Sequence, residues 1–134
     1  MPYQHIAIKI TQNSYKSSQA IGDVFSYIRS ADSTTLILCD GKGHGISANI
    51  AATLNTSYLQ NLIESGFSTR VALDKLLDFF RHNGLNGSHY SVFTIARIFN
   101  DGMVNILNYS MPFPIIISQS GTKILKGREI EINN

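Results

Sequence analysis

The feature that most constrains the fold is the stretch from Thr34 to Ala48, Thr-Thr-Leu-Ile-Leu-Cys-Asp-Gly-Lys-Gly-His-Gly-Ile-Ser-Ala. Residues 34–39 are apolar or β-branched and carry no charge, which predicts a strand buried in a sheet. This strand ends on Asp40, glycines follow at positions 41, 43 and 45, and a helix is predicted from Ile46. Because a carboxylate is costly to bury without a partner, Asp40 at this place indicates a ligand site.

The glycine-rich turn does not match the common phosphate-binding loops. The pattern Gly-x-x-x-x-Gly-Lys-Ser/Thr is absent, and residues 41–45 also lack the dinucleotide-binding spacing. A carboxylate next to exposed backbone carbonyls instead suits a hard divalent cation such as Mg²⁺ or Mn²⁺. The alternative is an ordinary glycine turn in which Asp40 caps the following helix.

Length and composition are those of one ordinary globular domain. The chain has 134 residues, of which 43% are hydrophobic and 15% charged, and a net charge of +2. Its eleven Lys and Arg residues are scattered, which argues against a nucleic-acid partner. The single cysteine, Cys39, favours a reducing, cytoplasmic compartment. Neither a signal peptide nor a membrane span is expected, because no suitable apolar run is present.

The order of periodic segments predicts an α+β domain in which antiparallel sheets are layered with helices. Two adjacent helical segments interrupt a series of strand segments, and Asn100-Asp101-Gly102 predicts a hairpin turn. Strands are predicted near residues 3–10, 23–29, 34–40, 90–99, 103–109, 114–118 and 122–132, and helices over 46–64 and 69–82.

Apolar spacing predicts which sides of the two helices are buried. In the first helix, apolar residues at 50, 54, 58 and 62 form a stripe, and Gly66 is expected to end the helix. Ser68 is the expected N-cap of the second helix. The expected core positions of that second helix are Leu73, Leu76, Leu77 and Phe80.

Several motifs together resemble the metal-dependent (type 2C, PPM) serine/threonine protein phosphatases. They are Gly22-Asp23, followed by residues 40–45 (Asp-Gly-Lys-Gly-His-Gly) with Ala48 close behind. More narrowly, the chain is similar to the bacterial branch typified by stage II sporulation protein E. Three later segments follow in the order of that branch: Ser91-Val92-Phe93-Thr94, Asp101-Gly102 and residues 108–114 (Asn-Tyr-Ser-Met-Pro-Phe-Pro).

The resemblance implies a fold, a reaction and a set of site residues. In the family two sheets lie between helix layers, and two Mg²⁺ or Mn²⁺ ions bridge a water that attacks a phosphoserine or phosphothreonine. By position, Asp23 and Asp40 are the implied bridging carboxylates, and Gly41 is a metal ligand through its backbone carbonyl. His44 is either a general acid or a residue that braces the loop.

The resemblance also implies that residues 1–134 are a single phosphatase domain without the family's C-terminal portion. The family has two further metal-binding aspartates beyond this length, whereas Asp101-Gly102 is predicted to be a hairpin tip, and Glu129 and Glu131 lack the motif. We therefore expect weak metal binding and little turnover by these residues alone. One helix layer is expected to be missing or thin, and the uncovered apolar surface favours self-association.

The leading functional hypothesis is metal-dependent hydrolysis of phosphoserine or phosphothreonine on a protein in bacterial signalling. By resemblance, a phosphorylated antagonist of an anti-sigma factor is a candidate substrate, although no residue of this chain selects it. The alternatives are a non-catalytic protein-binding module with the same fold and, less favoured, a nucleotide-binding domain that uses the glycine turn.

Overall fold

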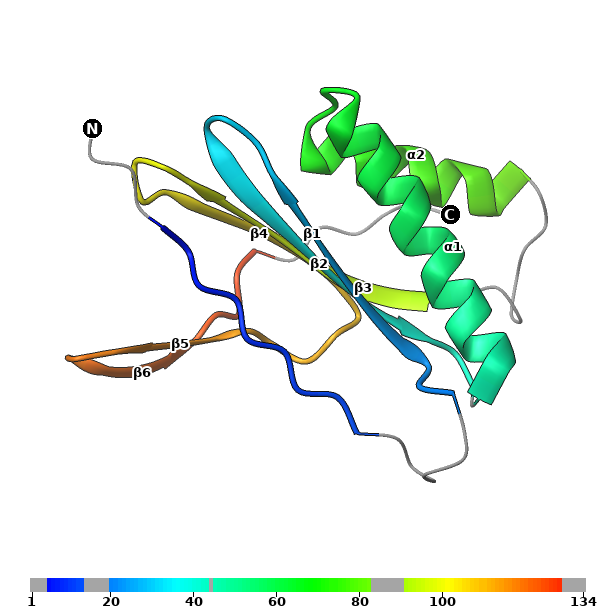
Figure 1. Ribbon diagram of the computed structural model, residues 1–134, viewed down its shortest axis with the longest axis horizontal. Helices are drawn as coiled ribbons and strands as arrows, with labels where there is room; N and C mark the ends of the chain where they lie inside the picture. The colour runs from blue at the N-terminus through cyan, green and yellow to red at the C-terminus, as the bar shows by residue number, and fades with distance from the viewer. Residues whose placement is uncertain (1–4, 14–19, 44, 83–90, 129–134) are drawn as a thin grey trace.

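The structure is a computed structural model that describes residues 5–13, 20–43, 45–82 and 91–128. Within them the chain forms an α+β fold with two antiparallel sheets and two helices, as the sequence predicts (Figure 1). The elements are β1 (Asp23–Arg29), β2 (Ser33–Gly41), α1 (Gly45–Glu64), α2 (Thr69–His82), β3 (Ser91–Phe99), β4 (Val104–Tyr109), β5 (Ile115–Ser118) and β6 (Gly121–Ile124).

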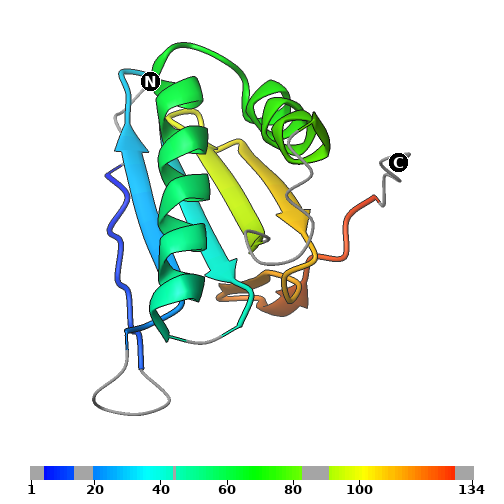
Figure 2. The ribbon, with the colours of Figure 1, turned by 90° about the vertical axis from the view of Figure 1, so that its right-hand side faces the viewer.

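Four strands form the main sheet in the order β1-β2-β3-β4, and each pairs antiparallel with its neighbour. Strands β5 and β6 form a separate two-stranded sheet. Both helices lie on one side of the main sheet, while the β5–β6 hairpin and residues 5–13 lie on the other (Figures 1 and 2). Among the described residues no helix covers that second side.

The core lies between the helices and the main sheet. Alternate residues of β2 and β3 face the helices, and Ile37, Cys39, Phe93 and Ile95 are almost completely buried there. The core positions predicted for α2 are confirmed, since Leu73, Leu76, Leu77 and Phe80 are all buried.

The predicted apolar stripe of α1 is only half correct, because Tyr58 and Leu62 pack against the core whereas Ile50 and Leu54 do not. Ile50 and Leu54 are 51% and 58% exposed, because a strict four-residue spacing drifts around a helix by about 40° per step. The stripe therefore faces outward at Ile50 and reaches the side of α2 only at Tyr58, whose ring stacks on that of Phe79. The residues that α1 buries instead are Ala48, Ala51, Ala52, Asn55, Thr56, Leu59 and Ile63.

The turn between the helices is the one that the sequence predicts. Gly66 has a φ of 94°, and the amide of Phe67 donates to the carbonyl of Leu62 at 3.1 Å, as in a glycine-ended helix. Ser68 caps α2, because its Oγ accepts a hydrogen bond of 3.2 Å from the amide of Val71.

Two strand predictions differ from the structure. Residues 5–10 form no strand, although they run beside β1, where the Arg29 side chain donates to the carbonyl of Ile6 at 2.9 Å. A side-chain contact replaces the backbone ladder that a strand needs. The last strand ends at Ile124 and does not continue over residues 125–128, while residues 129–132 and Tyr90 lie outside the described residues.

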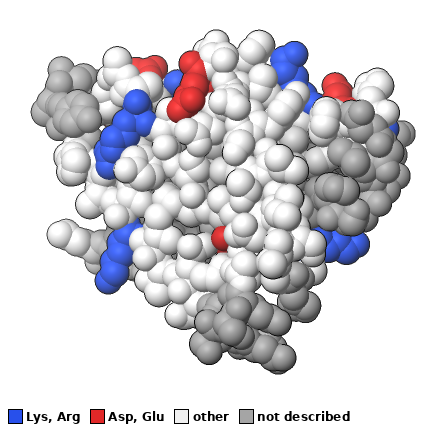
Figure 3. All heavy atoms as spheres, turned by 45° about the vertical axis from the view of Figure 1, so that its right-hand side comes forward, with Lys and Arg blue, Asp and Glu red and all other residues white. Residues whose placement is uncertain are grey.

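Much of the surface is uncharged. Figure 3 shows one face on which most residues are uncharged and the Lys, Arg, Asp and Glu side chains lie mainly towards the edges. Residues 45–63 of α1 contain no charged side chain, and Ile46 is 71% exposed. Even so, neither described helix has the length and apolar character that crossing a bilayer requires.

Candidate metal centre

Asp23 and Asp40 lie directly opposite each other at one end of the main sheet. Asp23 is the first residue of β1 and pairs with Asp40, near the end of β2. Directly opposite residues of an antiparallel pair have Cβ atoms about 5 Å apart and point to the same face. The two carboxylates therefore share one face and one end of the sheet, a register that the sequence could not give.

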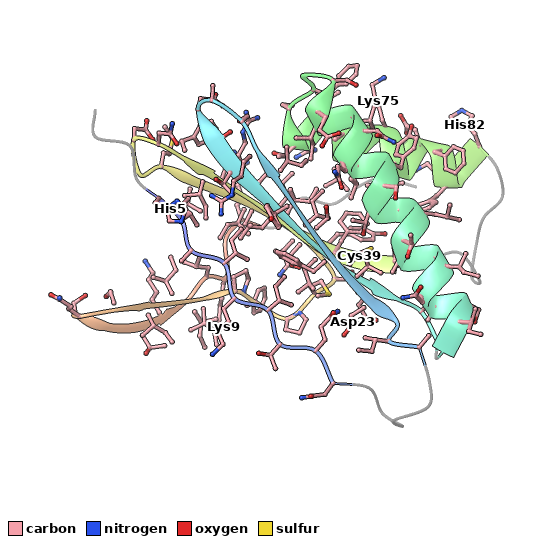
Figure 4. The ribbon with its side chains drawn as sticks, in the orientation of Figure 1. His5, Lys9, Asp23, Cys39, Lys75 and His82 are labelled. Carbon is pink, nitrogen blue, oxygen red and sulfur yellow. The ribbon has the colours of Figure 1, made fainter. Side chains whose placement is uncertain are left out.

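That face is the one turned away from the helices. The next residue along β2 on the helix side, Cys39, is buried, whereas Asp40 and Asp23 are both exposed. The neighbouring pair on the carboxylate face is Phe25 and Leu38. Figure 4 shows Asp23 at the lower end of β1, below Cys39 and to the left of the start of α1. The carboxylates thus border an apolar surface and remain open to a ligand.

Small residues fix the backbone around the two carboxylates. A Cβ on Gly41 would stand 1.9 Å from the carbonyl oxygen of Ala48, and one on Gly22 would stand 3.1 Å from the Cβ of Ala48. The amide of Gly41 donates to the carbonyl of Gly22 at 3.2 Å. The start of α1 therefore packs directly on the strand ends that carry Asp23 and Asp40, which gives the motif glycines and Ala48 a physical role.

Two amide side chains hold the segment that leads into Asp23. Asn49 of α1 donates to the carbonyl of Ile21 at 2.7 Å, and Gln12 donates to the carbonyl of Asp23 at 3.0 Å. The start of β1 is thus attached both to the helix and to residues 5–13. Neither residue stands out in the sequence, because polar side chains in a loop and at a helix start are common.

The electrostatics of the pair favour a bound cation. Partial burial raises the pKa of the Asp40 carboxyl, and Asp23 raises it further through charge repulsion and a hydrogen bond between the two side chains. The ion pairs formed within the described residues are Arg70–Asp74, Arg81–Asp78 and Arg97–Asp32, and none of them neutralises Asp23 or Asp40. Two adjacent carboxylates without a basic partner in these ranges fit a hard divalent cation.

The described residues supply only part of a metal site. Within residues 5–13, 20–43, 45–82 and 91–128, no third His, Cys, Asp or Glu joins the pair to make a group of three. His44, Glu129 and Glu131 lie outside these ranges, so the roles predicted for His44 stay predictions. Lys42 is exposed.

The other acids and histidines that the sequence analysis names, where the structure describes them, lie away from the pair. Gly102, with a φ of 90°, and Asp101 form the β3–β4 turn, where Asp101 accepts a hydrogen bond of 2.9 Å from the amide of Met103. This confirms the hairpin tip. Asp74 and Asp78 form exposed ion pairs on α2, and His5 and His82 are exposed.

A buried polar cluster lies directly behind Asp40, on the helix side of the sheet. The thiol of Cys39 donates to Ser91 Oγ at 3.2 Å, and Asn55 Nδ2 of α1 donates to the same oxygen. All three residues are buried, and burial raises the pKa of the Cys39 thiol, which the hydrogen bond to Ser91 opposes only in part. The sequence does not single out Asn55, because the apolar stripe of α1 runs through other positions. On the face of α1 that is actually buried, Asn55 is a polar residue at core spacing, and that spacing is the signal that identifies it.

Asn108 shapes the loop after β4. Its side chain accepts from the amide of Met111 at 2.9 Å and donates to the carbonyls of Met111 and Pro112 at 3.0 and 3.2 Å. The φ of Ser110 is 57°, so the chain turns sharply between these residues. Part of the asparagine-to-proline stretch is therefore a side-chain-braced turn that leads towards β5.

Comparison with known proteins identifies the family. Residues 30–130 match the family model of stage II sporulation protein E (SpoIIE), so the chain belongs to this family. The resemblance to the PPM phosphatases, and to their SpoIIE-like branch, is thereby confirmed. No curated protein sequence matches the chain significantly.

Three solved structures illustrate the shared fold. They are the RsbU and RsbW domains of Rv1364c from Mycobacterium tuberculosis (20% identity, TM-score 0.73, 84% of this chain and 32% of that chain), the PP2C phosphatase domain with a fragment of the regulatory domain of SpoIIE from Bacillus subtilis (18%, 0.73, 86% and 35%), and RsbX in complex with magnesium (14%, 0.68, 86% and 55%). At these identities the likeness shows the fold alone. The chain spans between about a third and just over half of the length of these solved chains.

Proposed function

We propose that this chain provides the first two metal-binding carboxylates of a protein serine/threonine phosphatase that acts in bacterial signalling. The observation that carries the proposal is the cross-strand pair of Asp23 and Asp40, held on one face at one end of the sheet. Membership of the SpoIIE family supports the reaction class. The magnesium named for RsbX supports a divalent cation, either Mg²⁺ or Mn²⁺.

Each residue of the site has a proposed task. Asp23 and Asp40 supply carboxylate oxygens, and Gly41 supplies its backbone carbonyl. A bound cation would supply Lewis acidity and an activated water for in-line attack on the phosphorus of a phosphoserine or phosphothreonine. His44, next to this turn in the sequence, either protonates the leaving alkoxide or braces the loop.

The proposed substrate is a small phosphorylated protein, with a phosphorylated antagonist of an anti-sigma factor as the candidate. Support comes from the similar structures, since one contains RsbU and RsbW domains and another is described as part of the bacterial stressosome, a modular system for second-messenger signalling. The proposed compartment is the bacterial cytoplasm, which fits the single buried cysteine.

Metal binding by these residues alone is proposed to be weak. Two carboxylates and one carbonyl are few protein ligands for hard cations, which otherwise keep their water. A dissociation constant of about 1 mM or weaker is therefore expected, as for other ligand-poor oxygen sites. Turnover by the 134 residues is accordingly expected to be small.

A suitable test detects weak Mn²⁺ binding directly. In ¹⁵N-labelled protein, paramagnetic Mn²⁺ should broaden the amide resonances of residues 22–24 and 40–42 first. Asp40→Asn and Asp23→Asn should abolish this local broadening, whereas Asp101→Asn, which removes the same charge at the far end of the sheet, should not. Unchanged local broadening in Asp40→Asn would remove the metal role.

The same proteins separate the alternative functions. Manganese-dependent release of phosphate from an aryl phosphate, even if slow, should be lost in Asp40→Asn and kept in Asp101→Asn. Stabilisation by ATP without metal would instead favour the nucleotide-binding hypothesis. Absence of both metal binding and ATP binding would favour a non-catalytic protein-binding module.

A further inference from the structure

The buried cluster of Cys39, Ser91 and Asn55 lies on the helix side of the strand end that carries Asp40. Cys39 precedes Asp40 and Gly41 follows it, and Ser91 of β3 is the cross-strand partner of Gly41. Ser91 Oγ receives hydrogen bonds from both Cys39 on β2 and Asn55 on α1. A single serine hydroxyl therefore connects two strands and a helix immediately behind the carboxylate pair.

The cluster has an apolar setting. Ile37, Phe93 and Ile95, which continue β2 and β3 on the same face, are 0–1% exposed. Replacement of a hydrogen-bonded pair by apolar groups of the same shape is often nearly neutral for stability, while loss of one partner is costly. Stability alone therefore does not explain why three polar side chains are buried here. Their effect on the position of Asp40 and Gly41 gives a better reason.

The geometry limits how Asp40 can move. Side chains alternate along a strand, so the orientation of Asp40 is set by how Cys39 and Gly41 sit on the opposite face. Gly41 has no side chain to anchor it, and its position depends on Ala48 of α1 and on its partner Ser91. Asn55 lies on α1 as well, so the helix holds this strand end both through Ala48 and through the Asn55–Ser91 hydrogen bond.

We propose that Ser91, Asn55 and Cys39 are positioning residues for the metal centre, which keep the Asp40 carboxylate and the Gly41 carbonyl in the arrangement that binds a divalent cation. This inference rests on the proposed function. Groups that orient metal ligands from behind typically change metal affinity by 10–100-fold when mutated. Ser91 is central because both hydrogen bonds end on its hydroxyl.

The main test compares Ser91→Ala with Ile95→Val. Both residues lie on β3, face the helices and are 0% exposed, but only Ser91 reaches the cluster. Urea unfolding measures the stability of each variant, and Mn²⁺ broadening of amide resonances measures metal affinity. We expect Ser91→Ala to weaken Mn²⁺ binding at least 10-fold, and Ile95→Val to leave it within 2-fold of the original.

A second readout needs no metal. The amide of Gly41 donates to Gly22, so its hydrogen exchange reports the integrity of this strand end. In metal-free protein, Ser91→Ala should accelerate exchange at Gly41 by more than its effect on global stability explains. In Ile95→Val the exchange at Gly41 should change only in proportion to global stability.

A milder pair of variants guards against failure of Ser91→Ala to fold. Cys39→Ala removes the hydrogen bond to Ser91, whereas Cys39→Ser keeps a donor of similar size, so Mn²⁺ affinity should fall in the first and be restored in the second. Equal affinities in Cys39→Ala, Cys39→Ser and the original chain would overturn the inference. If Asp40→Asn itself left Mn²⁺ binding unchanged, the proposed function would fail; loss in Asp40→Asn with no loss in Ser91→Ala or Cys39→Ala would overturn only the positioning role.

Discussion

The backbone of Gly41 touches the backbone of Ala48 at the start of α1. A side chain at position 41 would place its Cβ 1.9 Å from the Ala48 carbonyl oxygen and 2.6 Å from its carbon. These atoms belong to a helix backbone and cannot rotate away, unlike the end of a flexible side chain. The contact fixes the distance between the helix and the strand end that carries Asp40.

Gly41→Ala should therefore destabilise the protein strongly. Overpacking of a tight site lowers the free energy of unfolding by about 1–3 kcal/mol. Because the clash here is with helix backbone, we expect a loss at or above the upper end of that range. Urea unfolding measures the loss. Gly43→Ala is the matched control, because a Cβ there has open space and only its φ of 97° is unfavourable. A smaller loss for Gly41→Ala than for Gly43→Ala would contradict the packing argument.

The raised pKa of Asp40 predicts how stability depends on pH in the absence of metal. Between the pKa of the unfolded chain and the higher pKa of the folded chain, the folded protein binds more protons than the unfolded one. The contribution of Asp40 to stability is therefore fully present at acidic pH and is lost as the pH rises through the folded pKa. Urea unfolding in a chelating buffer should show this fall for the original chain and a flatter profile for Asp40→Asn. An identical profile for the two proteins would exclude the effect.

Divalent cations should restore the stability that is lost when the Asp40 carboxyl ionises. A ligand that binds only the folded state stabilises it by RT ln(1 + [L]/Kd), which is about 1.4 kcal/mol for 10 mM Mn²⁺ and a dissociation constant of about 1 mM. Thermal unfolding with and without Mn²⁺ measures the gain. We expect the gain to disappear in Asp23→Asn and in Asp40→Asn, and to persist in Asp101→Asn. A gain of the same size in all four proteins would indicate binding elsewhere.

The sequence predicted both helices and most of the strands, and it singled out Asp23 and Asp40 as candidate metal ligands. The uncharged run before Asp40 defined β2, Gly66 and Ser68 defined the turn between the helices, and Asp101-Gly102 defined the β3–β4 hairpin. These signals are local, because each depends on the conformational preference of one or two residues. They place Asp23 and Asp40 at strand ends but leave open whether the two residues lie opposite each other.

The features that cannot be predicted from the sequence depend on packing between segments that are distant along the chain. The pairing of Asp23 with Asp40 is a matter of register, and a shift by one residue would send one carboxylate to the other face. The buried side of α1 does not follow from apolar spacing, because alanines rather than Ile50 and Leu54 face the sheet, where Gly22 and Gly41 allow close approach. The Asn55–Ser91 hydrogen bond spans 36 residues of sequence and follows only from that correct face.

The exposed apolar residues of the β5–β6 sheet favour self-association. Ile115, Ile116 and Ile117 of β5 are 59%, 45% and 80% exposed, and an isolated two-stranded sheet is only marginally stable in water. A second copy that pairs with an exposed strand edge would cover these residues and add hydrogen bonds. Sedimentation should therefore show association that increases with protein concentration. Ile117→Lys should shift it towards monomer by placing a charge in the contact, whereas Ser57→Lys, which adds the same charge at an exposed position of α1, should not. A purely monomeric original chain at high concentration, or equal effects of the two lysines, would exclude association through β5.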